Sequence, residues 1–120
     1  MAGTDERNHL GKQLWVIFSD PTEKAGDRRE VFAQHIAHQH DIEDRGILFA
    51  AGPFLGADGN PKGPGMIIIR AKDEAEARSI ADSDPFHKLG YRRYRLEHWR
   101  MNEGTFNLRI NYSNRSYVID

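Results

Sequence analysis

The stretch from Arg28 to Phe54 constrains the fold most, because its pattern predicts one amphipathic helix, a glycine stop and a strand ending in Gly52-Pro53. At about 100° per residue around the helix axis, one face gathers the apolar side chains, with His35 near its middle. In angular order that face holds Val31, Ile42, His35, Gln39, Phe32 and Ile36. A histidine there forgoes packing energy on the order of 1–3 kcal/mol relative to a leucine. His35 is therefore either a hydrogen-bonded core residue or a functional group.

The remaining patterns extend this helix and strand into a complete domain. Asp27 is the expected N-cap of the helix, with Glu30 completing a capping box, and Gly46 is its expected C′ residue. Strands are expected over residues 14–18, 47–55, 65–71 and 91–99, with a second helix over residues 74–81 and a short turn of helix from Pro85 to Leu89. The resulting order is β-α-β-β-α-β, which predicts an α+β, ferredoxin-like split βαβ fold.

The ends of the chain differ from this central pattern. Residues 1–12 are polar and predict a flexible N-terminal arm. Near the other end, Phe106, Leu108, Ile110 and Tyr112 alternate with polar residues, a turn follows at residues 113–116, and Tyr117 to Ile119 return. This pattern predicts a C-terminal β-hairpin within residues 101–120, appended to the same domain.

Composition excludes several classes of function. The 17 basic and 18 acidic residues nearly balance, which argues against a general nucleic-acid or membrane surface. The sequence has no cysteine, and therefore no disulfide, zinc–thiolate site or thiol nucleophile. No apolar run approaches the ~20 residues of a membrane span, and the first residues lack the apolar core of a signal peptide. We expect a soluble cytoplasmic protein of one domain.

Asp84 is the second residue that could carry chemistry. It precedes Pro85 between two helical segments, so it could simply cap the short helix. In a split βαβ fold, however, both helices pack on one face of the sheet. The end of the second helix can then approach the buried face of the first. A carboxylate there could accept one imidazole N–H of His35 and raise the basicity of the other nitrogen.

Two further features are open to more than one interpretation. Arg28 lies two helical turns before His35 and could bind an anionic or phenolic oxygen, or it could be an exposed arginine. His35 and His38, at i and i+3, could share a metal ion, but His40 points away and no known metal motif is present, so we expect no metal. Gly52-Pro53 is expected to end its strand.

In their order and spacing these residues resemble the YCII (YciI-like) family. The resemblance covers about residues 13–100 and rests on the helix with Arg28 and His35, then Gly46, Ala51-Gly52-Pro53, Gly65, Glu74-Ala75, Asp84-Pro85-Phe86 and His98-Trp99. It implies a ferredoxin-like fold that pairs into a dimeric α/β barrel. It also implies an active-site dyad of His35 and Asp84. The polar arm and the C-terminal hairpin depart from the short family pattern.

The resemblance also implies a reaction, because one assigned in the family is dehydrochlorination of a chlorinated hydroxyhydroquinone. We therefore expect a cofactor-independent lyase of a hydroxylated aromatic, with His35 as base and Asp84 orienting it. Arg28, Gly52, Pro53 and Phe86 are the expected substrate-binding residues, and the expected partners are a small aromatic or quinol substrate and a second copy of the chain. The alternatives are a muconolactone-isomerase-like isomerase and a non-catalytic dimeric binding or interaction domain, since fold alone does not decide function.

Overall fold

The computed structural model describes residues 10–119, so most of the predicted N-terminal arm lies outside the described residues. Contacts divide the chain into two units. One spans residues 13–99, and the other contains the described residues 10–12 and 100–119. None of the helices between residues 10 and 119 combines the length and the apolar character needed to cross a membrane.

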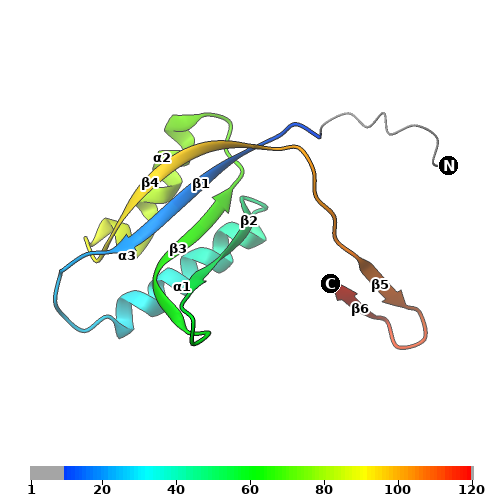
Figure 1. Ribbon diagram of the computed structural model, residues 1–120, viewed down its shortest axis with the longest axis horizontal. Helices are drawn as coiled ribbons and strands as arrows, with labels where there is room; N and C mark the ends of the chain where they lie inside the picture. Colours follow the sequence, from blue (N-terminus) through cyan, green and yellow to red (C-terminus); the bar gives the residue numbers. More distant parts are fainter. Residues whose placement is uncertain (1–9, 120) are drawn as a thin grey trace. The chain divides into compact units, whose positions relative to one another are not determined.

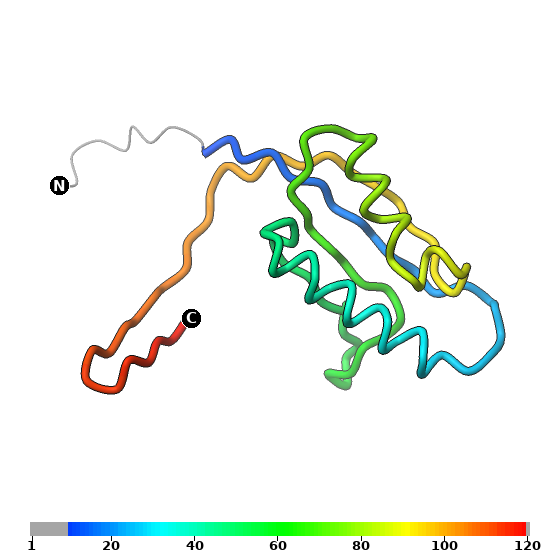
Figure 2. The backbone as a smooth tube through the Cα atoms, turned by 180° about the vertical axis from the view of Figure 1, so that it is seen from behind, coloured from blue at the N-terminus to red at the C-terminus, as the bar shows by residue number. Residues whose placement is uncertain are grey.

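The larger unit is an α+β structure built on a four-stranded sheet (Figure 1). The strands are β1 (Lys12–Pro21), β2 (Leu48–Leu55), β3 (Pro61–Ile69) and β4 (Arg92–Met101), and the helices are α1 (Arg29–Asp44), α2 (Glu74–Ser83) and α3 (Pro85–Lys88). The sheet order is β2-β3-β1-β4, and β3 pairs antiparallel with both β1 and β2. This order is compatible with the predicted ferredoxin-like fold. Figure 2 shows α1 and α2 over the same face of the sheet.

The apolar run in β1 has no polar alternation because both of its faces contact apolar side chains. Trp15 and Ile17 pair with Ile69 and Ile67 and face the helices. They form the core with Ile42, Ala77 and Ala81. Fully burying a side chain such as Ile69, which is 0% exposed, stabilises the fold by roughly 1.5–3 kcal/mol.

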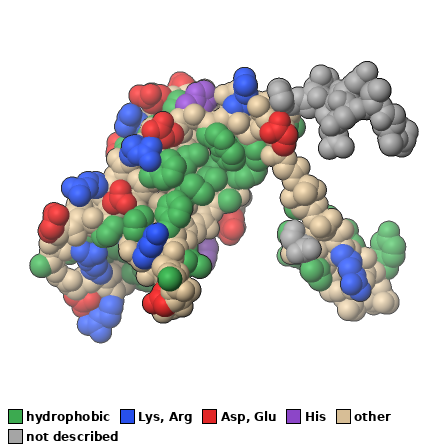
Figure 3. Space-filling model, viewed as in Figure 1, with side chains coloured by type: hydrophobic (Ala, Val, Ile, Leu, Met, Phe, Trp, Pro, Cys, Tyr) green, Lys and Arg blue, Asp and Glu red, His purple; other side chains and the backbone are tan. Residues whose placement is uncertain are grey.

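The opposite sheet face, which we call the open face, carries Val16 paired with Ile68 and Phe18 paired with Met66. Figure 3 looks onto this face and shows hydrophobic side chains gathered over the central strands. The Arg95 guanidinium lies over the Phe18 ring at 4.2 Å from its centroid. The chain therefore has a second apolar surface that its own helices do not cover.

The predicted starts of α2 and α3 are correct, whereas α2 runs two residues further than predicted, α3 ends one residue earlier, and the predicted cap of α1 is wrong. Arg28, not Asp27, is the N-cap, and the Asp27 carboxylate instead accepts the backbone N–H of Arg29 at 3.0 Å and pairs with the Arg29 guanidinium. That geometry places Asp27 one residue too early to cap the helix. Gly46 is the C′ residue with φ of 73°, and the Ile47 N–H bonds the Ile42 carbonyl, which completes a Schellman motif.

The smaller unit contains the predicted hairpin, formed by β5 (Leu108–Asn111) and β6 (Ser116–Ile119). The two strands pair antiparallel, with Leu108 opposite Ile119 and Asn111 opposite Ser116. Tyr112, in the turn, is 92% exposed.

Candidate active site

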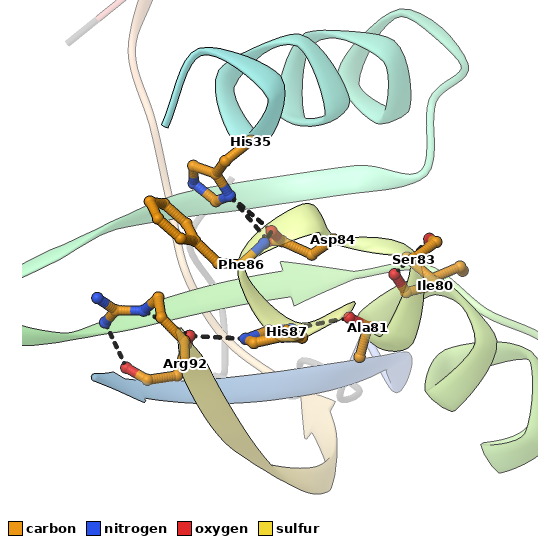
Figure 4. Close-up of polar contacts among 9 residues, drawn as sticks. His35, Ile80, Ala81, Ser83, Asp84, Phe86, His87 and Arg92 are labelled. Atoms are coloured by element: carbon orange, nitrogen blue, oxygen red, sulfur yellow. Dashed lines mark hydrogen bonds and ion pairs between the residues drawn. The ribbon is translucent and has the colours of Figure 1, made fainter. Parts of the chain in front are cut away.

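His35 and Asp84 lie in direct contact, as the sequence predicted (Figure 4). His35 projects from the middle of α1, and its Nδ1 lies 2.9 Å and 2.8 Å from the two carboxylate oxygens of Asp84. The two residues are 49 positions apart, and the packing of α3 beside α1 brings them together. The imidazole of His35 is 17% exposed, whereas the Asp84 carboxylate is 3% exposed.

Asp84 acts as a helix cap and as the partner of His35 at the same time. It ends α2 and is the N-cap of α3, where Pro85 takes the first helical position. Its Oδ1 accepts the backbone N–H of Phe86 at 3.0 Å. Burial by itself raises the pKa of the Asp84 carboxyl, but the hydrogen bond and charge of His35, with the Phe86 amide, outweigh it. The pKa therefore lies below its usual value, and the carboxylate stays ionised at neutral pH.

This contact assigns the tautomer of neutral His35. A carboxylate can only accept hydrogen bonds, so Nδ1 must carry the proton and Nε2 carries the lone pair. Among residues 10–119 no group forms a hydrogen bond with Nε2. The arrangement is that of a general base, with one nitrogen held by a carboxylate and the other available to take a proton.

Two phenylalanines border the imidazole. The Phe86 ring lies with its centroid 4.9 Å from that of His35, and the Phe32 ring lies 6.4 Å from both. Phe86 is 8% exposed, but Phe32 is 55% exposed, which corrects the prediction that Phe32 belongs to the buried face of the helix. On the core side of Asp84, the gap bordered by Ile17, His38, Gln39 and His87 is too narrow for a water molecule. The dyad is therefore closed to water on its core side.

A second polar network lies beside the dyad, and the sequence did not predict it. The Nε of Arg92 donates to Ser19 Oγ at 2.9 Å, and its Nη2 donates to the carbonyls of Ser19 and Gly63. His87 Nδ1 lies 2.7 Å from the Ala81 carbonyl, so in the neutral imidazole Nδ1 carries the proton, and the Ser19 hydroxyl donates to Nε2 at 2.7 Å. Ser19 is 4% exposed, and both its hydroxyl and its backbone carbonyl take part in this network.

No local pattern marks these residues as a group. Ser19 belongs to the end of the first strand, His87 to the short helix and Arg92 to the start of the last strand. The sequence signal that could have drawn attention to them is a serine directly after the apolar run of β1.

The other predicted site residues are placed differently. Phe86 is next to His35, as described. Arg28 donates to the Lys24 carbonyl at 2.8 Å and lies over the Tyr91 ring, so it is beside the Arg92 network but does not touch the dyad. Gly52 and Pro53 are exposed on the edge strand β2, opposite Met66 and Gly65. Within residues 10–119 we find no contact between them and the dyad.

The histidines of α1 form no recognisable metal centre in the described part of the chain. No group of three or more His, Asp or Glu side chains there has a geometry that could hold an ion. Burial lowers the pKa of His38, and the charge of His35 acts in the same direction, although Asp84 and Asp41 oppose it. His38 is therefore more readily neutral than an exposed histidine.

Comparison with known protein families decides the identity of the domain. The model of the YCII-related domain matches residues 13–100, most of the chain. The chain belongs to this family. The match includes both dyad residues and the whole four-stranded sheet except the first residue of β1 and the last residue of β4.

Solved structures include a similar protein within the same fold. It is the 5-chloro-2-hydroxyhydroquinone dehydrochlorinase (TftG) from Burkholderia phenoliruptrix AC1100, in complex with 2,5-dihydroxybenzoquinone. The match has a TM-score of 0.59 and 24% sequence identity, and it covers 72% of this chain and 92% of that chain. A likeness at this identity establishes the shared fold of the YCII-related domain. A search of curated proteins gives no significant match.

Proposed function

We propose that this YCII-related protein is a cofactor-independent lyase that removes hydrogen chloride from a chlorinated hydroxyhydroquinone. The observation that carries the proposal is the His35–Asp84 contact, which leaves His35 Nε2 with a free lone pair. A positioned base of this kind contributes roughly 10²–10⁴-fold to a proton-transfer step. The similar dehydrochlorinase supports the choice of substrate class.

The reaction needs only proton transfers. His35 Nε2 takes the proton of a ring hydroxyl, and the ring becomes a keto tautomer as the carbon bearing chlorine receives a proton from the imidazolium. His35 then takes a second hydroxyl proton, and chloride leaves that carbon with the electron pair of the C–Cl bond. The products are a hydroxyquinone and HCl, and no electron passes to or from another reactant. Asp84 holds the imidazole and stabilises its charged form.

The remaining predicted residues have roles in binding within this proposal. Phe86 and Phe32 provide aromatic surfaces next to His35, where a flat ring can pack with offset or edge-to-face geometry. Arg28 adds a cation on the same side of the molecule as the Arg92 network. Gly52 and Pro53 would contact substrate only if a second copy of the chain brought its β2 to the site.

We also propose that the protein is a homodimer that packs sheet on sheet into a dimeric α/β barrel. The open face supports this proposal, because its centre is apolar and the helices of the same chain lie on the other side. A stable interface of this kind buries at least ~1,200 Å² in total.

Chloride release tests the proposed reaction. We would assay wild type on 5-chloro-2-hydroxyhydroquinone and a panel of chlorinated hydroquinones, together with H35A, H35Q and the control H40Q. Wild type and H40Q should release chloride, because His40 is exposed on the opposite side of α1. Both His35 variants should lose roughly 10²-fold or more, since glutamine hydrogen-bonds but accepts no proton at neutral pH. Activity of H35Q above about a tenth of wild type would contradict the base role.

A further inference from the structure

Arg92 is a cation near the dyad that is held in place by hydrogen bonds from Nε and Nη2, while its Nη1 group can still bind a ligand. Its Nε and Nη2 hydrogens are occupied by Ser19 and Gly63, whereas Nη1 has no hydrogen-bond partner among residues 10–119. No carboxylate in that part of the chain forms a salt bridge with it. A guanidinium carries five N–H donors in a fixed plane, so two donors on Nη1 remain free.

The surroundings of Arg92 do not neutralise its charge. Burial lowers the pKa of the guanidinium and the nearby charge of Arg28 acts in the same direction, while Asp20 and Asp84 oppose the shift. A partly buried cation without an ion-pair partner is costly unless a ligand compensates it. Arg28 is itself fixed by the carbonyls of Lys24 and Thr22, so two guanidinium groups face this region without a paired acid.

The orientation of Arg92 is set in advance. The His87 tautomer fixed by the Ala81 carbonyl makes Ser19 donate to His87, so the Ser19 oxygen is left to accept from Arg92 Nε. A donor that is already oriented loses little entropy when a ligand binds. The Ser19–His87 pair therefore acts as a support for the arginine and does not need to touch the ligand.

Arg92 and His35 also share a neighbour. The Arg92 Cζ lies 6.0 Å from the centroid of the Phe86 ring, and the His35 ring lies 4.9 Å from the same centroid. Figure 4 shows the Phe86 side chain between the imidazole and the guanidinium. A ligand that bound both His35 Nε2 and Arg92 Nη1 would therefore lie against Phe86.

From this geometry we propose that Arg92 is a substrate-binding residue and that the substrate is an aromatic anion whose ionised oxygen binds Arg92 Nη1. This inference rests on the proposed function for the position of the reacting hydroxyl, and it narrows the substrate from a hydroxylated aromatic to one that is already ionised. A lysine could supply charge here, but its ammonium group has three N–H donors. Those are too few to make three hydrogen bonds to Ser19 and Gly63 and two more to the ligand.

Binding of 4-nitrocatechol tests the proposal without any turnover. At a pH where its first hydroxyl is ionised, the probe is a coloured anion, and its dimethyl ether, 4-nitroveratrole, is a neutral match of the same ring. We expect wild type to bind 4-nitrocatechol at least roughly tenfold more tightly than the ether, because a hydrogen bond to a charged group is lost with the ether. Equal affinity for the two compounds, or no binding of 4-nitrocatechol, would overturn the proposal.

Variants locate the binding group. R92Q should weaken 4-nitrocatechol binding roughly tenfold or more and R92K by less, with folding of each checked by thermal melting, while R28Q should have the smaller effect. Weaker binding of 4-nitrocatechol by R28Q, together with unchanged binding by a folded R92Q or R92K, would overturn the assignment of Arg92 as the binding group. H35Q should still bind the probe even when it releases no chloride. Failure of the lyase proposal and failure of the Arg92 proposal therefore give different results.

Discussion

The substitution D84N tests how the carboxylate controls the base. Asp84 accepts two N–H groups, from Phe86 at 3.0 Å and from His35 at 2.8 Å. Asparagine has one acceptor oxygen and one NH₂ group. If its oxygen keeps the Phe86 amide, its NH₂ group faces His35 Nδ1, and two donors cannot face each other at that distance. The proton of the imidazole then moves to Nε2, and the free base is lost.

The expected size of the effect follows from these contacts. Loss of a positioned base costs roughly 10²–10⁴-fold in rate, and inversion of a catalytic histidine tautomer costs about 10⁴-fold in a serine-protease triad. The fold should survive, because asparagine can still cap α3. Replacing hydrogen bonds to a charged group by neutral ones costs about 1–2 kcal/mol of stability at this 3%-exposed side chain.

Two measurements decide the outcome. Nitrogen-15 NMR of the imidazole at a pH where His35 is neutral should show the proton on Nδ1 in wild type and on Nε2 in D84N. Chloride release by D84N should fall roughly 10²–10⁴-fold. D82N is the matched control, since Asp82 is exposed and bonds only the Tyr94 hydroxyl in the described chain. A D84N protein that keeps the Nδ1 proton, or more than a tenth of the activity, would refute the reasoning.

Three further predictions concern stability and assembly. The folded pKa of Asp84 is below its ordinary value of 3.8, so its stabilising effect is present above that pH and is lost as the pH falls through the folded pKa. Urea unfolding should show that the free energy of unfolding of wild type exceeds that of D84N at neutral pH, and that this difference shrinks only in acid. D73A should lower the free energy of unfolding by about 1 kcal/mol, because Asp73 caps α2 by accepting the Glu76 N–H; an unchanged melting temperature would count against this. Sedimentation at micromolar concentration should show a wild-type dimer and an F18E monomer, and a wild-type monomer would contradict the sheet-on-sheet dimer.

Most of the elements could be predicted because their signals are local. The C′ position of Gly46 and the cap at Asp73 join groups only three to five residues apart. The strand β1 follows from a continuous apolar run, and the direction of the side chains of α1 follows from helical period. Asp27 was misassigned as the cap because either Asp27 or Arg28 could precede the helix, and the backbone conformation at Arg28 decides between them.

Local pattern and topology made a contact between His35 and Asp84 possible, and the family resemblance implied that the two form a dyad. His35 stood out because a titratable group occupied an apolar face, and Asp84 because it preceded Pro85 between two helices. A split βαβ fold places both helices on one side of the sheet, which makes a contact between residues 49 positions apart a reasonable inference. Phe32 shows the limit of this approach, because helical period gives the direction of a side chain but not whether anything covers it.

Sequence alone therefore determined the order of helices and strands, the C′ glycine of α1, and the two residues most suited to acid–base chemistry. Only the tertiary structure decided that Arg92, Ser19 and His87 form a network and that hydrogen bonds assign the tautomers of His35 and His87. It also decided that no group among residues 10–119 bonds the two donors of Arg92 Nη1. The physical reason is separation along the chain. Helical and capping hydrogen bonds link near neighbours, whereas Ser19 meets His87 and Arg92 across 68 and 73 positions, and only the strand order and the packing of α3 bring those groups together.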